Sequence, residues 1–166
     1  MEKPTDLVIK FYSAFQQGDY KTMQTCYHPD TMFSDELFPL LKGRQVKAMW
    51  HMLVDNGKDS GLQITFDNVR ASGGKIECDW EARYRLSMTG RNIQNKIHAR
   101  FEISDDLIVR HVDHFDFYRW AGMAFGIKGV VLGWAPFFKH KVQQAVGQRL
   151  QKFIDNHSEY QSAIKK

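Results

Sequence analysis

Cysteine is scarce in this sequence: Cys26 and Cys78 are the two present, and neither lies at ligand-like spacing from histidines. This excludes a disulfide framework and argues against a zinc site, so we expect two reduced, buried thiols and neither metal nor cofactor. The first residues are charged and lack the apolar segment of a signal peptide, which predicts a cytoplasmic protein.

Motifs for nucleic-acid binding are also missing, although the net charge is +4 and the pI is about 9.0. Much of the positive excess lies near the C-terminus. The residues concerned are Lys139, Lys141, Arg149, Lys152, Lys165 and Lys166. A solvated helix face explains these charges, so we expect no nucleic-acid partner.

No uninterrupted apolar run in the sequence is long enough to cross a membrane as a helix. The stretch from Trp120 to Phe138 approaches the necessary length, but glycines and Pro136 interrupt it. We therefore expect a packed lid or a dimer contact there, and a membrane partner only as an exception through the C-terminal helices. A further helix is predicted from Phe137 to about Asn156.

Composition is that of a globular chain, with 43% hydrophobic and 25% charged residues. Apolar residues at helical spacing predict helices at 5–17, after Asp19, and from Gly43 to about Asn56. The period then changes to two, which predicts three antiparallel strands joined by turns at 72–75 and 89–90.

A last strand from Leu107 to Phe117 carries two ionisable groups, His111 and Asp113, on an otherwise apolar face. The short segment 31–35 has the same pattern, and alternation places Phe33 and Asp35 on one side. We expect Asp35, His111 and Asp113 to share the interior of the domain.

The element order, with Gln-Gly-Asp at 17–19, Tyr-His-Pro-Asp-Thr-Met-Phe-Ser-Asp at 27–35 and His-Val-Asp-His-Phe-Asp at 111–116, resembles the nuclear transport factor 2-like superfamily. It is most similar to the SnoaL-like branch of polyketide cyclases, ketosteroid isomerases and limonene epoxide hydrolases. Lys-Gly-Arg at 42–44 and Thr-Gly-Arg at 89–91 support the resemblance.

This resemblance implies an α+β, cystatin-like fold: a cone-shaped, curved, antiparallel or mixed sheet wrapped around three N-terminal helices, with extra C-terminal helices. We expect a pocket domain at 1–118 and a helical extension at 119–166 packed on it.

The resemblance also places Asp35 at the proton-transferring aspartate of the isomerases and Asp113 at a pocket aspartate of the epoxide hydrolases. The oxyanion donors of the isomerases correspond to Phe11 and Ala99, which cannot donate hydrogen bonds. The hydrolase Arg and Asp correspond to Ala82 and Tyr84. The resemblance therefore does not imply the complete catalytic site of either the isomerases or the epoxide hydrolases.

A carboxylate in an apolar pocket keeps its proton to higher pH, which suits acid/base catalysis near neutrality. Asp35, Asp113 and His111 are the candidate catalytic residues. The structural alternatives are that Asp35 caps a turn and that Asp113 and His111 are hydrogen-bonded core residues. The candidate ligand-binding residues are Phe11, Phe33, Trp50, Trp80, Tyr84, Ala99, Phe101 and Phe115.

We thus expect a cofactor-independent isomerase, cyclase, dehydratase or epoxide hydrolase that binds a small apolar molecule. The alternative is a non-catalytic module that binds a hydrophobic metabolite. We also expect a homodimer, because Ile108, Val112 and His114 should lie on an outer sheet face that needs a cover.

Overall fold

A computed structural model describes residues 3–161 of the chain. It contains six α-helices, six β-strands and a short 3₁₀ helix in the described range. In chain order these are α1 Pro4–Gln16, α2 Tyr20–Thr25, β1 Tyr27–Ser34, β2 Leu41–Lys42, α3 Arg44–Ser60, β3 Gln63–Ser72, β4 Lys75–Arg85, β5 Asn92–Ser104, β6 Leu107–His114, α4 Phe117–Phe125, α5 Ile127–Leu132, α6 Pro136–Asp155 and η1 Ser158–Tyr160.

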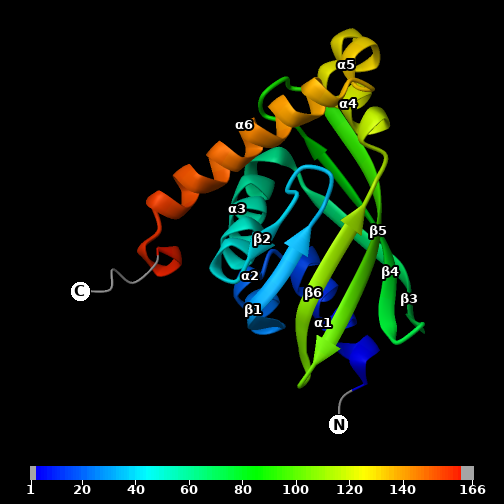
Figure 1. Cartoon of the computed structure of the whole chain (residues 1–166), viewed down its shortest axis with the longest axis vertical. Coiled ribbons are helices and arrows are strands. Elements are labelled where there is room, and N and C mark those ends of the chain that lie inside the picture. The colour runs from blue at the N-terminus through cyan, green and yellow to red at the C-terminus, as the bar shows by residue number, and fades with distance from the viewer. Residues whose placement is uncertain (1–2, 162–166) are drawn as a thin grey trace.

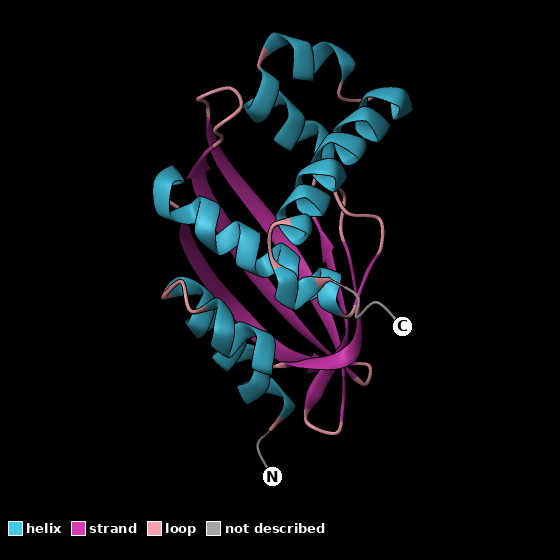
Figure 2. Ribbon diagram, turned by 90° about the vertical axis from the view of Figure 1, so that its left-hand side faces the viewer, coloured by secondary structure: helices cyan, strands magenta, loops and turns pink. Residues whose placement is uncertain are grey.

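All six strands form one curved sheet in the order β2-β1-β6-β5-β4-β3. The pairs from β3 to β6 are antiparallel, as their hairpin turns require, whereas β1 lies parallel to β6. Helices α1 and α3 contact the inner face of the sheet, and α6 crosses over α3 (Figures 1 and 2). The predicted α+β architecture with a mixed curved sheet is therefore confirmed.

Local signals of the sequence explain the start of α2 and the end of α3. Asp19 caps α2 by accepting a hydrogen bond from the Thr22 amide at 3.0 Å. Helix α3 continues past the expected end near Asn56 and stops at Gly61, whose φ of 67° is the left-handed conformation that glycine tolerates. The apolar stretch after Trp120 folds as parts of three helices, and no described helix is long and apolar enough to span a membrane.

The outer face of the sheet is covered by charged side chains that pair with one another. Arg70 and Arg100 both contact Glu77, at 2.9 and 3.2 Å, and His98 contacts Asp79 at 2.6 Å. These ion pairs give the charged side chains partners within the chain. The homodimer remains a prediction.

The last strand differs from the expectation in two ways. It ends at His114, because Asp116 caps α4 by accepting a hydrogen bond from the Arg119 amide at 2.9 Å. The register against β5 also shifts between Glu102 and Ile103, which turns Ile108 inward. Ile108 is fully buried within the chain, so its predicted place on an outer contact face is wrong.

Candidate active site

The parallel pairing of β1 and β6 brings the two candidate carboxylates to one edge of the sheet. Phe33 lies beside His111 in the register, and β1 ends one residue later at Ser34. Because parallel strands run in the same direction, Asp35 and Asp113 emerge at the same end. Both side chains line one cavity.

Asp35 is held in a fixed orientation by its own turn. Its Oδ1 accepts hydrogen bonds from the amides of Leu37 at 2.7 Å and Phe38 at 2.6 Å, and no described residue donates to Oδ2. Burial raises the pKa of Asp35 from 3.8 to about 7, the two amide bonds oppose this shift, and the nearby negative charge of Asp113 adds to it. Asp35 therefore does cap its turn, as the structural alternative expected, and its second carboxyl oxygen remains available to a ligand.

Asp113 receives two N–H donors on its Oδ1. His111 Nε2 lies 2.9 Å away and Trp80 Nε1 lies 3.4 Å away. On its other side, His111 Nδ1 lies 2.6 Å from the hydroxyl of Tyr27. Burial raises the pKa of Tyr27 well above its usual value, so this hydroxyl keeps its proton and donates it to Nδ1. The proton of a neutral His111 then lies on Nε2 and faces Asp113.

The cavity that both carboxylates line has a volume of about 530 Å³. Trp80, Tyr84 and Phe115 form part of its apolar wall, as the sequence predicted. Polar side chains also line the cavity, among them Asn56, Asp59, Arg85, Asn95 and Arg149. A volume of this size suits a small organic ligand.

The other predicted pocket residues lie behind this wall, in the core. They are Phe11, Phe33, Trp50, Ala99, Phe101 and His111, and none of them lines the cavity. His111 is enclosed because the ring of Phe101 lies 4.2 Å from it and that of Trp50 lies 5.7 Å from it, centre to centre. These aromatic rings pack behind the cavity wall, and His111 contacts the cavity lining through Asp113.

Two polar residues that the sequence reasoning passed over lie at the cavity wall or behind it. Asn95 lines the cavity and is 9% exposed. It lies between Ile93 and Ile97 in an alternating strand, a pattern that predicts an inward-facing side chain. Tyr12 is fully buried, and its hydroxyl has no partner among the described residues. The pKa of Tyr12 is raised by burial and further by the charge of Asp113. Its ring lies 5.7 Å from that of Trp80, centre to centre.

The C-terminal helices close one side of the cavity. Trp120 of α4 and Val146 and Arg149 of α6 belong to its lining, and Trp120 Nε1 donates to the Tyr84 hydroxyl at 3.1 Å. Of the stretch from Trp120 to Phe138, Trp120 lines the cavity, and the packed lid or dimer contact expected there remains a prediction. The boundary at residue 118 remains a prediction.

Helix α6 is also tied to the residue that follows Asp35. Lys139 and His114 pair with the carboxylate of Glu36, and Gln143 donates to the Glu36 carbonyl at 3.0 Å. A displacement of α6 would therefore pull on Glu36 and shift the turn that holds Asp35.

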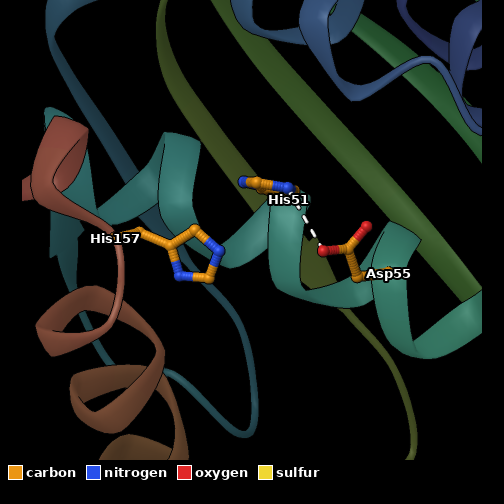
Figure 3. Close-up of side chains that lie close together, drawn as sticks. All are labelled: His51, Asp55 and His157. Atoms are coloured by element: carbon orange, nitrogen blue, oxygen red, sulfur yellow. Dashed lines mark ion pairs between the residues drawn. The ribbon is translucent and has the colours of Figure 1, made fainter.

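His51 does not line the cavity and faces the C-terminal turn, where its Nδ1 lies 2.9 Å from the Tyr160 hydroxyl. Its Nε2 lies 3.2 Å from Asp55, and His157 lies beside them, with all three ligand-type atoms within 4.8 Å of one another (Figure 3). Three such atoms could in principle hold a metal ion, a grouping that the sequence reasoning did not foresee. The buried imidazole of His51 is hydrogen-bonded to Tyr160, which in turn accepts a hydrogen bond from Gln24. These bonds explain its burial without a metal ion.

Comparison with known proteins supports this description of the fold. The family model of the SnoaL-like domain matches residues 8–111. No curated protein matches the sequence.

Solved structures with the same fold are similar to this chain at low identity. An NTF2-like protein of unknown function from Burkholderia pseudomallei has a TM-score of 0.62 and 17% identity, with 76% of this chain and 100% of that one covered. An LEH-like epoxide hydrolase from M. tuberculosis has a TM-score of 0.61 and 19% identity, with 80% and 96% covered. A candidate polyketide cyclase from Xanthomonas campestris pv. campestris has a TM-score of 0.59 and 19% identity, with 73% and 96% covered.

At such identities the structures show the shared fold alone. The family model, however, spans more than half of the chain. This protein belongs to the SnoaL-like domain family, within the nuclear transport factor 2-like superfamily.

Proposed function

We propose that this protein is a cofactor-independent enzyme that moves protons on a small apolar substrate, with Asp35 and Asp113 as its catalytic residues. The observation that carries the proposal is the meeting of these two carboxyl groups on one cavity, with the pKa of Asp35 raised to about 7. A carboxyl group with that pKa can give and take a proton near neutral pH.

The two groups differ in what surrounds them, and this difference suggests their roles. Asp35 is about half protonated at neutral pH, and its Oδ2 is the oxygen left to reach a ligand. Asp113 accepts hydrogen bonds from the N–H groups of His111 and Trp80, and these bonds favour its ionised carboxylate form. Asp35 therefore serves as the acid and Asp113 as the base.

In the simplest reaction, Asp35 donates its proton to a substrate oxygen while Asp113 accepts one from a substrate carbon or from an attacking water. The first case gives isomerisation, cyclisation or dehydration, and the second opens an epoxide. His111 is a positioning residue in either case, because its Nε2–H orients Asp113 and Tyr27 fixes its tautomer.

The relatives named as an epoxide hydrolase and a candidate polyketide cyclase are consistent with chemistry of this class, although their identity to this chain is only 19%. The apolar wall of Trp80, Tyr84 and Phe115 favours a flat or polycyclic substrate.

A second candidate function is ligand binding without chemistry. It is favoured by the apolar wall of the cavity, which Trp80, Tyr84 and Phe115 form in part. Phe11 and Ala99 lie in the core away from the cavity, so their lack of hydrogen-bond donors does not separate the two functions. A binding protein needs the cavity but not the carboxylate pair.

One experiment separates the two functions. A panel of small cyclic ketones, epoxides and polycyclic phenols would be tested for binding and turnover with the wild-type protein, Asp113→Asn and the control Asp30→Asn, whose side chain is exposed on β1. An enzyme should lose turnover in Asp113→Asn while its affinity changes little, because an amide cannot exchange the proton. Equal turnover in all three proteins would refute the acid/base proposal, and binding without turnover in any of them would favour the second function.

A further inference from the structure

Large apolar side chains project into solvent at one end of the molecule. Ile127, Val130 and Val131 of α5, with Trp134 and Phe137 just after it, are between 51% and 83% exposed. We call these five residues the apolar tip. They lie at the end of the molecule where α5 and the start of α6 stand clear of the sheet (Figure 1).

The packing of α5 explains why its large residues point outward. Gly129 lies directly against α4: a Cβ atom added to it would lie 1.9 Å from the carbonyl oxygen of Ala121. A Cβ atom on Gly133 would lie 2.3 Å from the Gly129 carbonyl oxygen and 3.2 Å from the side chain of Ala121. The contact with α4 is thus made mainly through Gly129 and Gly133, with the side chain of Val130 beside Gly122. Ile127, Val131 and Trp134 remain largely exposed. A helix packed only for stability would bury its large apolar residues instead.

The charge of this region has a single sign. From Phe117 to Ile154 the sequence contains no acidic residue. It contains Arg119, Lys128, Lys139, Lys141, Arg149 and Lys152. Lys128 follows Ile127 on α5, Lys141 lies on α6 after the apolar tip, and both are exposed. An apolar surface with exposed lysines matches a bilayer whose headgroups are negative.

From these observations we propose that the apolar tip docks this protein on the surface of an anionic lipid bilayer. Trp134 and Phe137 would enter the interface, and Lys128 and Lys141 would contact the phosphate groups. The sequence suggested no membrane partner beyond this C-terminal region, and docking on a surface needs no spanning helix.

Docking at this position would also bring the bilayer close to the cavity. A hollow lined by Thr89 and Arg91 on one side and by Phe125 and Ile127 on the other joins the β4–β5 loop to the α4–α5 corner. The same loop supplies Ser87, Met88 and Gly90 to the cavity lining. If the ligand is apolar, as proposed above, it could be taken directly from the membrane. This last step rests on the proposed function, whereas the docking itself does not.

The test is flotation of the full chain with phosphatidylcholine vesicles, with and without phosphatidylglycerol. We expect binding to the anionic vesicles, weakened by salt, and a loss of at least about ten-fold in the Trp134→Gln/Phe137→Gln double variant. Lys128→Glu should weaken binding to anionic vesicles more than to neutral ones. The matched control is Leu40→Gln, which changes an apolar side chain that is 53% exposed outside the tip and should bind like the wild type.

The double variant removes exposed side chains only, so circular dichroism and the melting temperature should show an intact fold. Wild-type protein that does not float, or a double variant that floats equally well, would overturn the proposal. Light scattering tests whether a second copy of the chain occupies the tip instead. A wild-type dimer that the double variant abolishes, in a protein that does not bind vesicles, would assign the tip to such a dimer. The assay measures no turnover, so its failure and that of the proposed enzyme are distinguishable.

Discussion

Replacing Asp35 by asparagine should change how the stability of the protein depends on pH. The pKa of Asp35 is about 7 in the folded chain, against an ordinary value of 3.8. Between these values the native state holds a proton that the unfolded state has lost, so stability falls as pH rises. Above pH 7 both states are ionised and the contribution no longer changes.

The size of the effect follows from the two pKa values. Each pH unit in this window costs about 1.4 kcal/mol, so the full interval from 3.8 to about 7 amounts to about 4 kcal/mol. Asp35 is only partly buried, so solvent screens part of this charge, and we expect about 2 to 4 kcal/mol in practice. Asparagine retains a carbonyl oxygen for the amides of Leu37 and Phe38, so the turn should persist.

The assay is urea unfolding of wild type and Asp35→Asn at intervals from pH 4.5 to 8.5. The variant should gain stability relative to the wild type as pH rises and then level off near pH 7.5. Subtraction removes the other titrating groups, and Asp30→Asn provides the control because its carboxyl group is exposed. A constant difference across the range would refute the claim that Asp35 is buried in its charged form at a cost.

Three further changes test the surroundings of the site. Trp120→Phe removes the hydrogen bond to the Tyr84 hydroxyl and leaves a gap under the lid, so urea unfolding should show a loss of about 1 to 3 kcal/mol. Tyr27→Phe removes the donor to His111 Nδ1 and should cost about 1 to 3 kcal/mol, while ¹⁵N NMR should show that the imidazole no longer holds one tautomer. An unchanged tautomer would show that Tyr27 does not fix it. Gly129→Ala should lower the melting temperature, because a methyl group cannot fit against α4 and overpacking costs about 1 to 3 kcal/mol, and an unchanged melting curve would contradict the close packing of α5.

Local patterns in the sequence were sufficient to predict much of the fold. Period-four apolar spacing predicted the N-terminal helices, and period-two alternation with Gly73-Gly74 predicted the β3–β4 hairpin, which the structure contains. The parallel pairing of β1 and β6 is a long-range contact, and no local signal specifies it. Alternation nevertheless placed Asp35 and Asp113 on the inner side, so both could be named in advance.

The limits of the cavity were harder to predict. Alternation identifies which side chains face inward, but it does not tell which of them touch a void and which touch another helix. Trp50 and Phe101 face inward and pack against His111, whereas Trp80 faces inward and reaches the cavity. The bulge that buries Ile108 depends on how two strands meet, and neither strand shows it alone.

The most direct test of the account is ¹³C NMR titration of the aspartate carboxyl groups, in the wild type and in Asp113→Asn. We predict that Asp35 titrates near pH 7 in the wild type and at lower pH in the variant, because the negative charge of Asp113 contributes to the shift. An Asp35 that titrates near 4 in both proteins would contradict the coupled acid/base pair on which the proposed function depends.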